Sequence, residues 1–204
     1  EYRTEMGDLR NAPTKTVPYV AFPDGSQMGD SAVIIGRLEA DSDPLDANLS
    51  DAEVQRGQEI SRRVEVDLYY PVLYSRFTDP AGWEHQKPLV KALVPWFVGW
   101  LLVPIIRRSQ VTACTNRGFT EPEPTWKTGT ETVDWIAEEL GDRPFLLGDS
   151  PHVVDCAVWG ELVHAATPPF DNTLTRHFHA DDRLTAYLRR MNERLGLDPG
   201  LGGV

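Results

Sequence analysis

Apolar residues recur at helical spacing through most of the chain after residue 50. In three segments they stand three or four positions apart, which gives one side of a helix an apolar surface. These positions are Ile60, Val64 and Leu68; Val133, Ile136, Ala137 and Leu140; and Leu184, Tyr187, Leu188, Met191 and Leu195. Together with two continuous apolar runs, the pattern predicts an all-helical part of about five helices.

The two apolar runs differ in length and in helix-breaking residues. Residues 153–166, VVDCAVWGELVHAA, are apolar nearly all round, which is typical of a central buried helix. Residues 92–106, ALVPWFVGWLLVPII, are fewer than the roughly 20 that cross a bilayer, and prolines and a glycine interrupt them. We therefore expect no membrane span and interpret this run as a buried core helix. A helix that touches a membrane or a partner protein is the alternative.

Capping and helix-breaking residues locate several helix ends. Ser50 to Glu53 and Thr128 to Glu131 both have the spacing of a capping box, and Gly141 is a typical helix stop. Pro71 is expected to end or kink the first long helix, because proline has no N–H for the helical hydrogen bond. Residues 107–126 are polar and rich in turn-forming residues, so we expect an irregular segment there.

The N-terminal residues have a different period. PYVAF and SQMG predict two short strands, and Asp24-Gly25 between them is a strong hairpin signal. After Asp30 the pattern becomes helical. The apolar positions on one face of that helix are Ile34, Ile35 and Leu38. Residues 41–49 have the composition of a linker, so we expect an α/β domain at 1–41 and an all-α domain at 50–197.

Charge and cysteine content narrow the class of protein. The 204 residues carry a formal net charge of −11, which argues against nucleic acid and anionic membrane surfaces as partners, because both attract Lys and Arg. The two cysteines, Cys114 and Cys156, form no CxxC pair and have no metal-ligand spacing. We see no signal peptide, so we expect a cytoplasmic protein. The negative charge is compatible with a protein that handles small molecules, and the cysteine spacing predicts that it uses no metal.

Two local features near the N-terminus are typical of ligand binding. A cis bond between Val17 and Pro18 would turn the backbone of Val17 outward, where it can pair with an extended peptide-like ligand. A trans proline on an edge strand is the alternative. Asp30 and Ser31 begin a helix, whose free N–H groups and positive dipole end can bind an anion. An ordinary N-cap by Asp30 is the alternative.

In this order, V-P, a D-G hairpin, D-S and an apolar helix resemble the second half of the N-terminal domain of glutathione transferases. FLLGDSPHVVDCAVWGEL, residues 145–162, resembles the buried C-terminal helix of the same family and its approach. The resemblance implies an α+β protein, in which a partial thioredoxin-like N-terminal domain is followed by an all-helical glutathione-transferase C-terminal domain.

The resemblance also implies a binding site for glutathione as co-substrate. The backbone of Val17, before Pro18, is expected to pair with the cysteinyl part of glutathione. Asp30 and Ser31 are expected to hold the γ-glutamyl part, and Lys15 to meet the glycyl carboxylate. In the family the first strand and helix precede this part of the chain and carry the Tyr, Ser or Cys that contacts the sulfur. The catalytic residue is therefore unknown.

A narrower resemblance concerns the middle of the chain. EVDLYYPVLYSRFTDPAGW, the apolar run and RRSQVTACTNRGF are similar to the branch of failed-axon-connections and metaxin-like proteins. The resemblance covers about residues 10 to 190. A homodimer is expected on the same grounds.

The aromatic end of the first long helix is the candidate wall of a pocket for a small apolar electrophile. It carries Tyr69, Tyr70, Tyr74 and Phe77. Aromatic side chains at helical spacing also pack in ordinary cores, which is the alternative.

Other polar groups carry less specific signals. RHFHADD, residues 176–182, could bind a metal but is expected to be a solvated loop, because no distant ligands accompany it. Cys156, in an apolar helix, is expected to be a buried thiol, whereas Cys114 lies near arginines and is a candidate reactive thiol. We expect Asp155 to be structural and not catalytic.

Two functions fit these observations. One is an enzyme that conjugates glutathione to a small apolar electrophile. Because a thiol with a pKa of about 8.5 is mostly protonated at neutral pH, such an enzyme must lower that pKa to supply thiolate. The other is a non-catalytic interaction module, which the apolar run favours. The fold alone does not decide between them, because function depends on the site.

Overall fold

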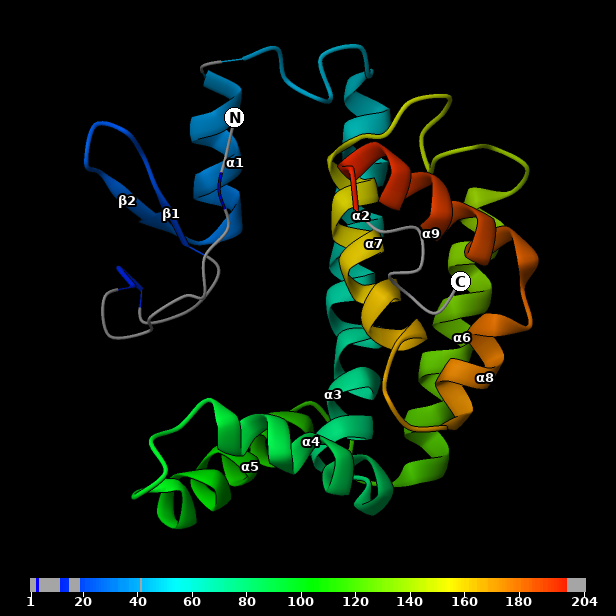
Figure 1. Ribbon diagram of the computed structural model, residues 1–204. Coiled ribbons are helices and arrows are strands. Elements are labelled where there is room, and N and C mark those ends of the chain that lie inside the picture. Colours follow the sequence, from blue (N-terminus) through cyan, green and yellow to red (C-terminus); the bar gives the residue numbers. More distant parts are fainter. Residues whose placement is uncertain (1–2, 4–11, 15–18, 41, 198–204) are drawn as a thin grey trace. The chain divides into compact units, whose positions relative to one another are not determined.

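The computed structural model describes residues 3, 12–14, 19–40 and 42–197, and the chain divides into two compact units, 1–48 and 49–204 (Figure 1). The first unit holds strands β1 (Tyr19–Ala21) and β2 (Gln27–Gly29) and helix α1 (Ser31–Ala40). The second holds α2 (Asp51–Asp67), α3 (Tyr69–Phe77), α4 (Pro80–Ala92), α5 (Gly99–Asn116), α6 (Pro122–Leu140), α7 (Val153–Ala166), α8 (Thr173–His179) and α9 (Asp182–Leu195).

Strands β1 and β2 form an antiparallel hairpin, as the sequence predicts. Their register pairs Tyr19 with Gly29. In the turn, the carboxylate of Asp24 accepts hydrogen bonds from the N–H and the hydroxyl of Ser26, at 2.8 and 2.6 Å. Gly25 has a φ of 84°, a conformation that glycine adopts without strain. Asp24 and Gly25, the residues from which the hairpin was predicted, therefore form its turn.

Helix α1 begins at Ser31, as expected, but its apolar face is only partly buried. Ile34 is 8% exposed, whereas Leu38 is 49% exposed. Leu38, which the helical pattern places on the same face as Ile34, is therefore not part of a core. The reason is the size of the layer beneath, because α1 contacts only two strands of three residues each in the described part of its unit.

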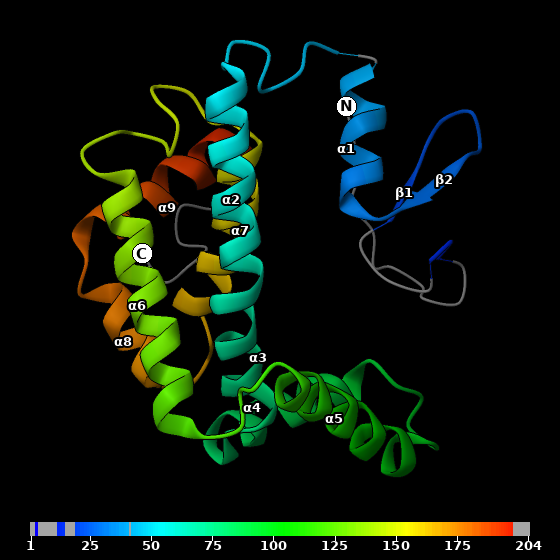
Figure 2. The same ribbon diagram turned by 180° about the vertical axis from the view of Figure 1, so that it is seen from behind.

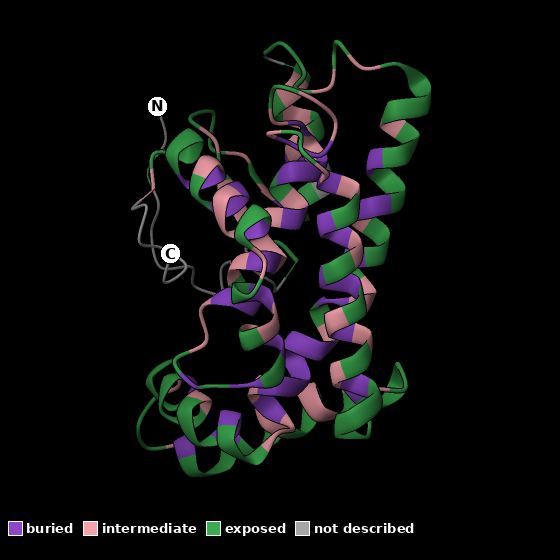
Figure 3. Cartoon of the chain, turned by 90° about the vertical axis from the view of Figure 1, so that its right-hand side faces the viewer, coloured by how far each residue is buried: buried purple, intermediate pink, exposed green. Residues whose placement is uncertain are grey.

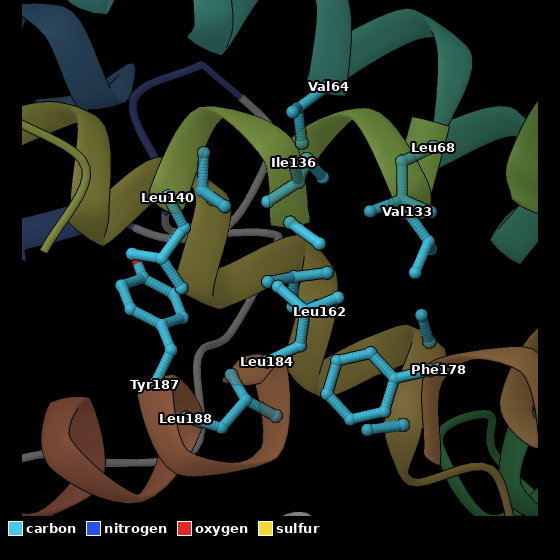
Figure 4. Close-up of a cluster of buried hydrophobic side chains, with 14 of the residues drawn as sticks. Val64, Leu68, Val133, Ile136, Leu140, Leu162, Phe178, Leu184, Tyr187 and Leu188 are labelled. Carbon is cyan, nitrogen blue, oxygen red and sulfur yellow. The ribbon is translucent and has the colours of Figure 1, made fainter. Parts of the chain in front are cut away.

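The larger core lies in the second unit, where α7 contacts α2, α3, α8 and α9. Figure 4 shows labelled side chains from α2, α6, α8 and α9 gathered around Leu162 of α7. Buried residues line the inward faces of the helices, and exposed residues cover their outward faces (Figure 3). The three predicted apolar series belong to this core, except that Leu195 is 38% exposed. The expectation of a central buried helix at 153–166 is confirmed.

A break separates α2 from α3 at Leu68, three residues before Pro71. Pro71 has no N–H to donate to the carbonyl of Asp67, and its ring crowds that carbonyl, so the helix cannot continue unbroken through this turn. The predicted end or kink is therefore confirmed. Pro71 itself lies inside α3 and is buried.

The capping box at Ser50 is also confirmed, since its hydroxyl accepts from the N–H of Glu53 and the carboxylate of Glu53 accepts from the N–H of Ser50. The second predicted box is wrong. Thr128 lies in the middle of α6 and donates its hydroxyl to the carbonyl of Pro124, 3.0 Å away. The helix begins at Pro122, where a proline is tolerated because the first N–H groups have no helical partner.

Two segments that were expected to be irregular are helical. Residues 107–116 continue α5, and most of RHFHADD lies in α8, so the described residues of the second unit form more helices than predicted. Both misassignments concern polar segments whose helical state depends on their neighbours. Helix α5 packs against α3 and α4, and α8 packs against α6, α7 and α9.

The run at 92–106 is not a buried core helix. Helix α4 ends within it at Ala92 and α5 begins at Gly99, and the residues between them include Pro95. Trp96 is 87% exposed and Trp100 is 78% exposed. Among the described residues, Val103 is the one member of this run that is buried in the smaller core, whose other buried residues are Leu73, Tyr74, Phe77, Trp83, Val90 and Cys114.

Candidate functional site

The candidate anion site lies where β2 meets α1. Asp30 has a φ of 72°, and it is the only residue other than glycine with a positive φ in the part of the chain that the structure describes. The carbonyl of Asp30 accepts a hydrogen bond from the N–H of Ile34 at 3.0 Å, so Asp30 already joins the helix. Asp30 and Ser31 are both exposed. A positive φ is uncommon outside glycine, and the first N–H groups of a helix have no helical partner, so this corner is a candidate place for an anion.

A close packing contact supports this corner from behind. A Cβ atom added to Gly29 would fall on the side chain of Thr14. Gly29 therefore allows Thr14 to lie against the end of β2. Thr14 was not predicted from the sequence. The residue that could have indicated a close contact here is Gly29, just before Asp30.

Three of the predicted ligand-binding residues, Lys15, Val17 and Pro18, lie outside the described residues. Their expected contacts with glutathione stay predictions.

The aromatic residues of α3 have different surroundings. Tyr69 is 39% exposed, and its ring lies edge-on to Tyr70 with centroids 5.1 Å apart. Tyr70 stacks on Phe119 at 5.7 Å. Tyr74 is 5% exposed and meets Trp126 edge-to-face at 5.6 Å. Of the three predicted pocket residues, Tyr69 therefore presents the most ring surface, and Tyr74 serves the smaller core.

A polar cluster at the contact between α3 and α7 lies near this aromatic end. Arg76 donates from Nη2 to the carbonyl of His164 at 3.1 Å and lies 3.3 Å from Nδ1 of the same residue. Within the described residues, Arg76 Nε and Glu161 Oε2 are buried without a hydrogen-bond partner. The sequence analysis missed this cluster, although a glutamate inside the apolar run at 153–166 was its signal.

Burial controls the protonation of this cluster. It raises the pKa of Glu161 to about 7, an effect that the carboxylate of Glu65 reinforces and the guanidinium of Arg76 opposes. Burial also lowers the pKa of His164 and, with a smaller contribution from Glu161, raises the pKa of Tyr69. The hydroxyl of Tyr69 therefore stays protonated at neutral pH and remains a hydrogen-bond donor.

The two cysteines have the reverse of their expected environments. Cys114 is 0% exposed, and burial raises the pKa of its thiol, so it is not a reactive thiolate. Cys156 is exposed, although it lies on α7. The expectation failed because α7 buries one face against the core and leaves Cys156 on the other.

The histidines of RHFHADD have local partners. Nε2 of His177 lies 2.7 Å from a carboxylate oxygen of Asp134, Nε2 of His179 lies 3.0 Å from the carbonyl of Ala166, and Asp181 caps α9. Among the described residues, no group of three or more His, Cys, Asp or Glu side chains is placed to hold a metal ion. No helix in that part of the chain is long and apolar enough to cross a membrane.

Comparison with known proteins gives two findings. Residues 129–191 match the family model of the glutathione S-transferase C-terminal domain. The chain is also 28% identical, over 95% of its length and 84% of the relative's, to the isoprene-epoxide–glutathione S-transferase of Rhodococcus sp. strain AD45. No solved structure matches the chain.

These findings support a relationship of the chain to the glutathione transferase superfamily. The helical second unit fits an all-helical C-terminal domain of that kind. The matched segment begins within α6 and ends within α9, so it includes the central helix α7. The narrower resemblance to failed-axon-connections and metaxin-like proteins stays a prediction. The thioredoxin-like character of the first unit is shown only as far as one hairpin followed by one helix.

Proposed function

We propose that this protein is a glutathione transferase that conjugates glutathione to a small apolar electrophile. The observation that carries the proposal is the similarity to a glutathione S-transferase along 95% of the chain, and not only within the helical unit. The relative's name identifies an epoxide as its substrate. A small apolar epoxide is therefore the class of electrophile we propose for this protein.

In the proposed complex, glutathione lies along the first unit. The γ-glutamyl carboxylate accepts hydrogen bonds from the hydroxyl and N–H of Ser31 and faces the positive end of α1. Asp30 pairs with the γ-glutamyl ammonium group. Val17, the residue before Pro18, is proposed to pair by its backbone with the cysteinyl part, and Lys15 to meet the glycyl carboxylate. The exposed position of Asp30 and Ser31 and the positive φ of Asp30 support this arrangement.

The proposed reaction is a displacement at an epoxide carbon. The thiolate sulfur of glutathione forms a bond to that carbon, the carbon–oxygen bond breaks, and the oxygen takes up a proton. Tyr69 is proposed to line the electrophile pocket together with Tyr70 and Tyr74. The phenol of Tyr69 is protonated at neutral pH, as that of an ordinary tyrosine is, and is proposed to donate a hydrogen bond to the developing alkoxide.

The test is product formation from glutathione and a small apolar epoxide such as 1,2-epoxybutane, measured by mass spectrometry of the thioether. We expect the purified protein to form the adduct faster than buffer alone. Tyr69→Phe should lower kcat by about 10-fold or more through loss of the hydroxyl. Tyr19→Phe, in β1, is the matched control and should leave the rate unchanged. Adduct formation no faster than in buffer contradicts the proposed enzyme.

A non-catalytic interaction module is the second candidate function. The exposure of Trp96 and Trp100 favours it, because large exposed aromatic side chains mark contact surfaces. Trp96 lies between α4 and α5 and Trp100 in the first turn of α5, whereas the candidate anion site lies in the first unit, so the two candidate functions use different residues. The expected homodimer also stays a prediction.

A further inference from the structure

An exposed apolar surface lies at the end of the α4–α5 hairpin. Figures 1 and 2 show α4 and α5 projecting together to one side from the end of α3. The exposed apolar side chains gather where α4 ends and α5 begins: Leu89, Leu93, Trp96, Phe97, Trp100, Leu101 and Ile105. We call these seven residues the hairpin tip. Their exposed fractions run from 47% to 87%, so every residue of the tip is exposed to solvent.

The opposite face of the hairpin is already used. Trp83 and Val90 of α4 and Val103 and Cys114 of α5 are buried in the smaller core against α3. Arg107 donates to the carbonyl of Phe77 at 3.0 Å and lies over the ring of Trp83, which fixes α5 to α3 and α4. The hairpin is thus held by one face and presents the tip on the other.

The charge around the tip is opposite to that of the whole chain. Residues 85–120 contain five Lys and Arg residues and no Asp or Glu, in a chain whose net charge is −11. Lys87 and Lys91 of α4 and Arg108 of α5 are exposed. The whole-chain charge, which argued against anionic surfaces, therefore does not describe this region.

We propose that the hairpin tip docks on the surface of an anionic lipid membrane. Trp and Phe side chains partition into the boundary between headgroups and acyl chains, and Lys and Arg nearby are attracted to anionic headgroups. The tip has exposed Trp and Phe side chains with Lys and Arg nearby. Residues 85–120 contain no acidic residue that would repel anionic headgroups. Docking by a short hairpin tip needs no membrane-spanning helix.

A second copy of the chain fits the tip less well. A twofold contact of tip on tip would bring the lysines and arginines of both copies together, and like charges repel. A contact between the tip and another face requires an apolar patch there. Outside the tip, the large apolar side chains exposed in the described residues are scattered, namely Val33, Leu38, Leu45, Tyr69 and Leu195.

The test is co-sedimentation of the whole protein with vesicles of phosphatidylcholine alone and of phosphatidylcholine with about one quarter phosphatidylserine. We expect the protein to sediment with the anionic vesicles, to show blue-shifted Trp fluorescence there, and to dissociate at high salt. The double variant Trp96→Ser, Trp100→Ser should bind at least about 10-fold more weakly. The double variant Lys87→Glu, Lys91→Glu should show a similar loss.

Two controls separate docking from general effects on the protein. Leu45→Ser and Arg62→Glu change exposed residues that are not part of the tip and should leave vesicle binding unchanged. All variants should unfold at the same temperature as the wild type, because none of the changed side chains is buried. Absence of the wild type from the anionic vesicle pellet overturns the proposal, as does equal binding by the Trp96, Trp100 variant. A wild-type dimer that this variant converts to a monomer, without vesicle binding, assigns the tip to a second copy instead.

Discussion

Asp155 shows how a single buried carboxylate organises the helical unit. It is 0% exposed, and its oxygens accept hydrogen bonds from the N–H of Leu146 at 2.9 Å, the N–H of His152 at 2.8 Å and the hydroxyl of Tyr187 at 3.0 Å. One side chain thereby joins the segment before α7, the start of α7 and the middle of α9. This agrees with the expectation that Asp155 is structural.

Replacing Asp155 should destabilise the protein strongly. Asp155→Ala leaves two backbone N–H groups and the hydroxyl of Tyr187 buried without this acceptor, so the free energy of unfolding should fall by about 3 kcal/mol. Urea denaturation measures this change. Asp149→Ala, at an exposed position three residues after Leu146, is the control and should change stability little. Equal stability of wild type and Asp155→Ala would show that the three hydrogen bonds are not formed.

Glu161 should make the stability depend on pH. Its pKa rises from 4.5 to about 7 on folding, so the folded state holds the proton more tightly than the unfolded state. Stability is then lost as the pH rises from about 4.5 to about 7, and the cost stays constant above that range. Glu161→Gln removes this cost. The variant should therefore gain on the order of 1 to 3 kcal/mol over the wild type at pH 8 and little at pH 4.5.

The comparison needs urea denaturation of both proteins at several pH values. Glu131→Gln, on the exposed side of α6, is the control and should change stability equally at each pH. A gain from Glu161→Gln that does not grow between pH 4.5 and pH 7 would show that this carboxyl group is not buried as the structure places it.

The sequence could predict Asp155 but not the environment of Glu161. Asp155 stands three residues after a helix N-cap, which is a local pattern. The contacts of Glu161 depend on α3, and Arg76 and His164 are 88 residues apart in the chain. Such a cluster depends on tertiary packing, which one sequence does not reveal. The same reason explains why the exposure of Cys156 and the burial of Cys114 were assigned in reverse.

At the scale of elements, the glycine at the start of α4 fixes the corner between α3 and α4. A Cβ atom added to Gly82 would fall on the carbonyl oxygen of Ser75 and lie 3.0 Å from Cε2 of Phe170. A backbone oxygen cannot move aside as the end of a flexible side chain can. The corner therefore requires a residue without a side chain at this position.

Gly82→Ala should lower the free energy of unfolding by about 2 kcal/mol or more, because α4 must move away from α3. Gly160→Ala is the matched control in α7. A Cβ there meets no atom within 4 Å, so alanine should be neutral or stabilise by about 0.5 to 1 kcal/mol through its better helix propensity. Thermal unfolding of both variants measures the contrast. Equal melting temperatures would contradict the close contact of α4 with Ser75.

Elements with a strong apolar period could be predicted, and elements defined by packing could not. The series on α2, α6 and α9 and the run on α7 each identified a helix of the larger core. The run at 92–106 misled because apolar composition predicts burial only when another surface is available to cover it. There, α3 already covers one face of the hairpin with Trp83 and Val103 inward, and the tip remains exposed.

At the scale of the molecule, the helical unit should fold without the first unit. Both hydrophobic cores consist of residues between Ile60 and Met191. A unit of about 150 residues buries roughly two thirds of its surface, which is enough for a stable domain. A fragment of residues 49–204 should therefore show a helical circular dichroism spectrum and a single cooperative thermal transition. A helical spectrum that is lost gradually on heating would contradict an independent unit.

The central claim is that this protein binds glutathione at the start of α1, and calorimetry tests it directly. We predict saturable heat when millimolar glutathione is titrated into the wild type. Ser31→Ala should weaken binding by about 10-fold or more, since a hydrogen bond to a charged ligand contributes about 1.5 to 3 kcal/mol. Ser42→Ala, at an exposed serine of the same unit, should bind like the wild type. The absence of heat from the wild type, or equal affinity of Ser31→Ala, would contradict the claim.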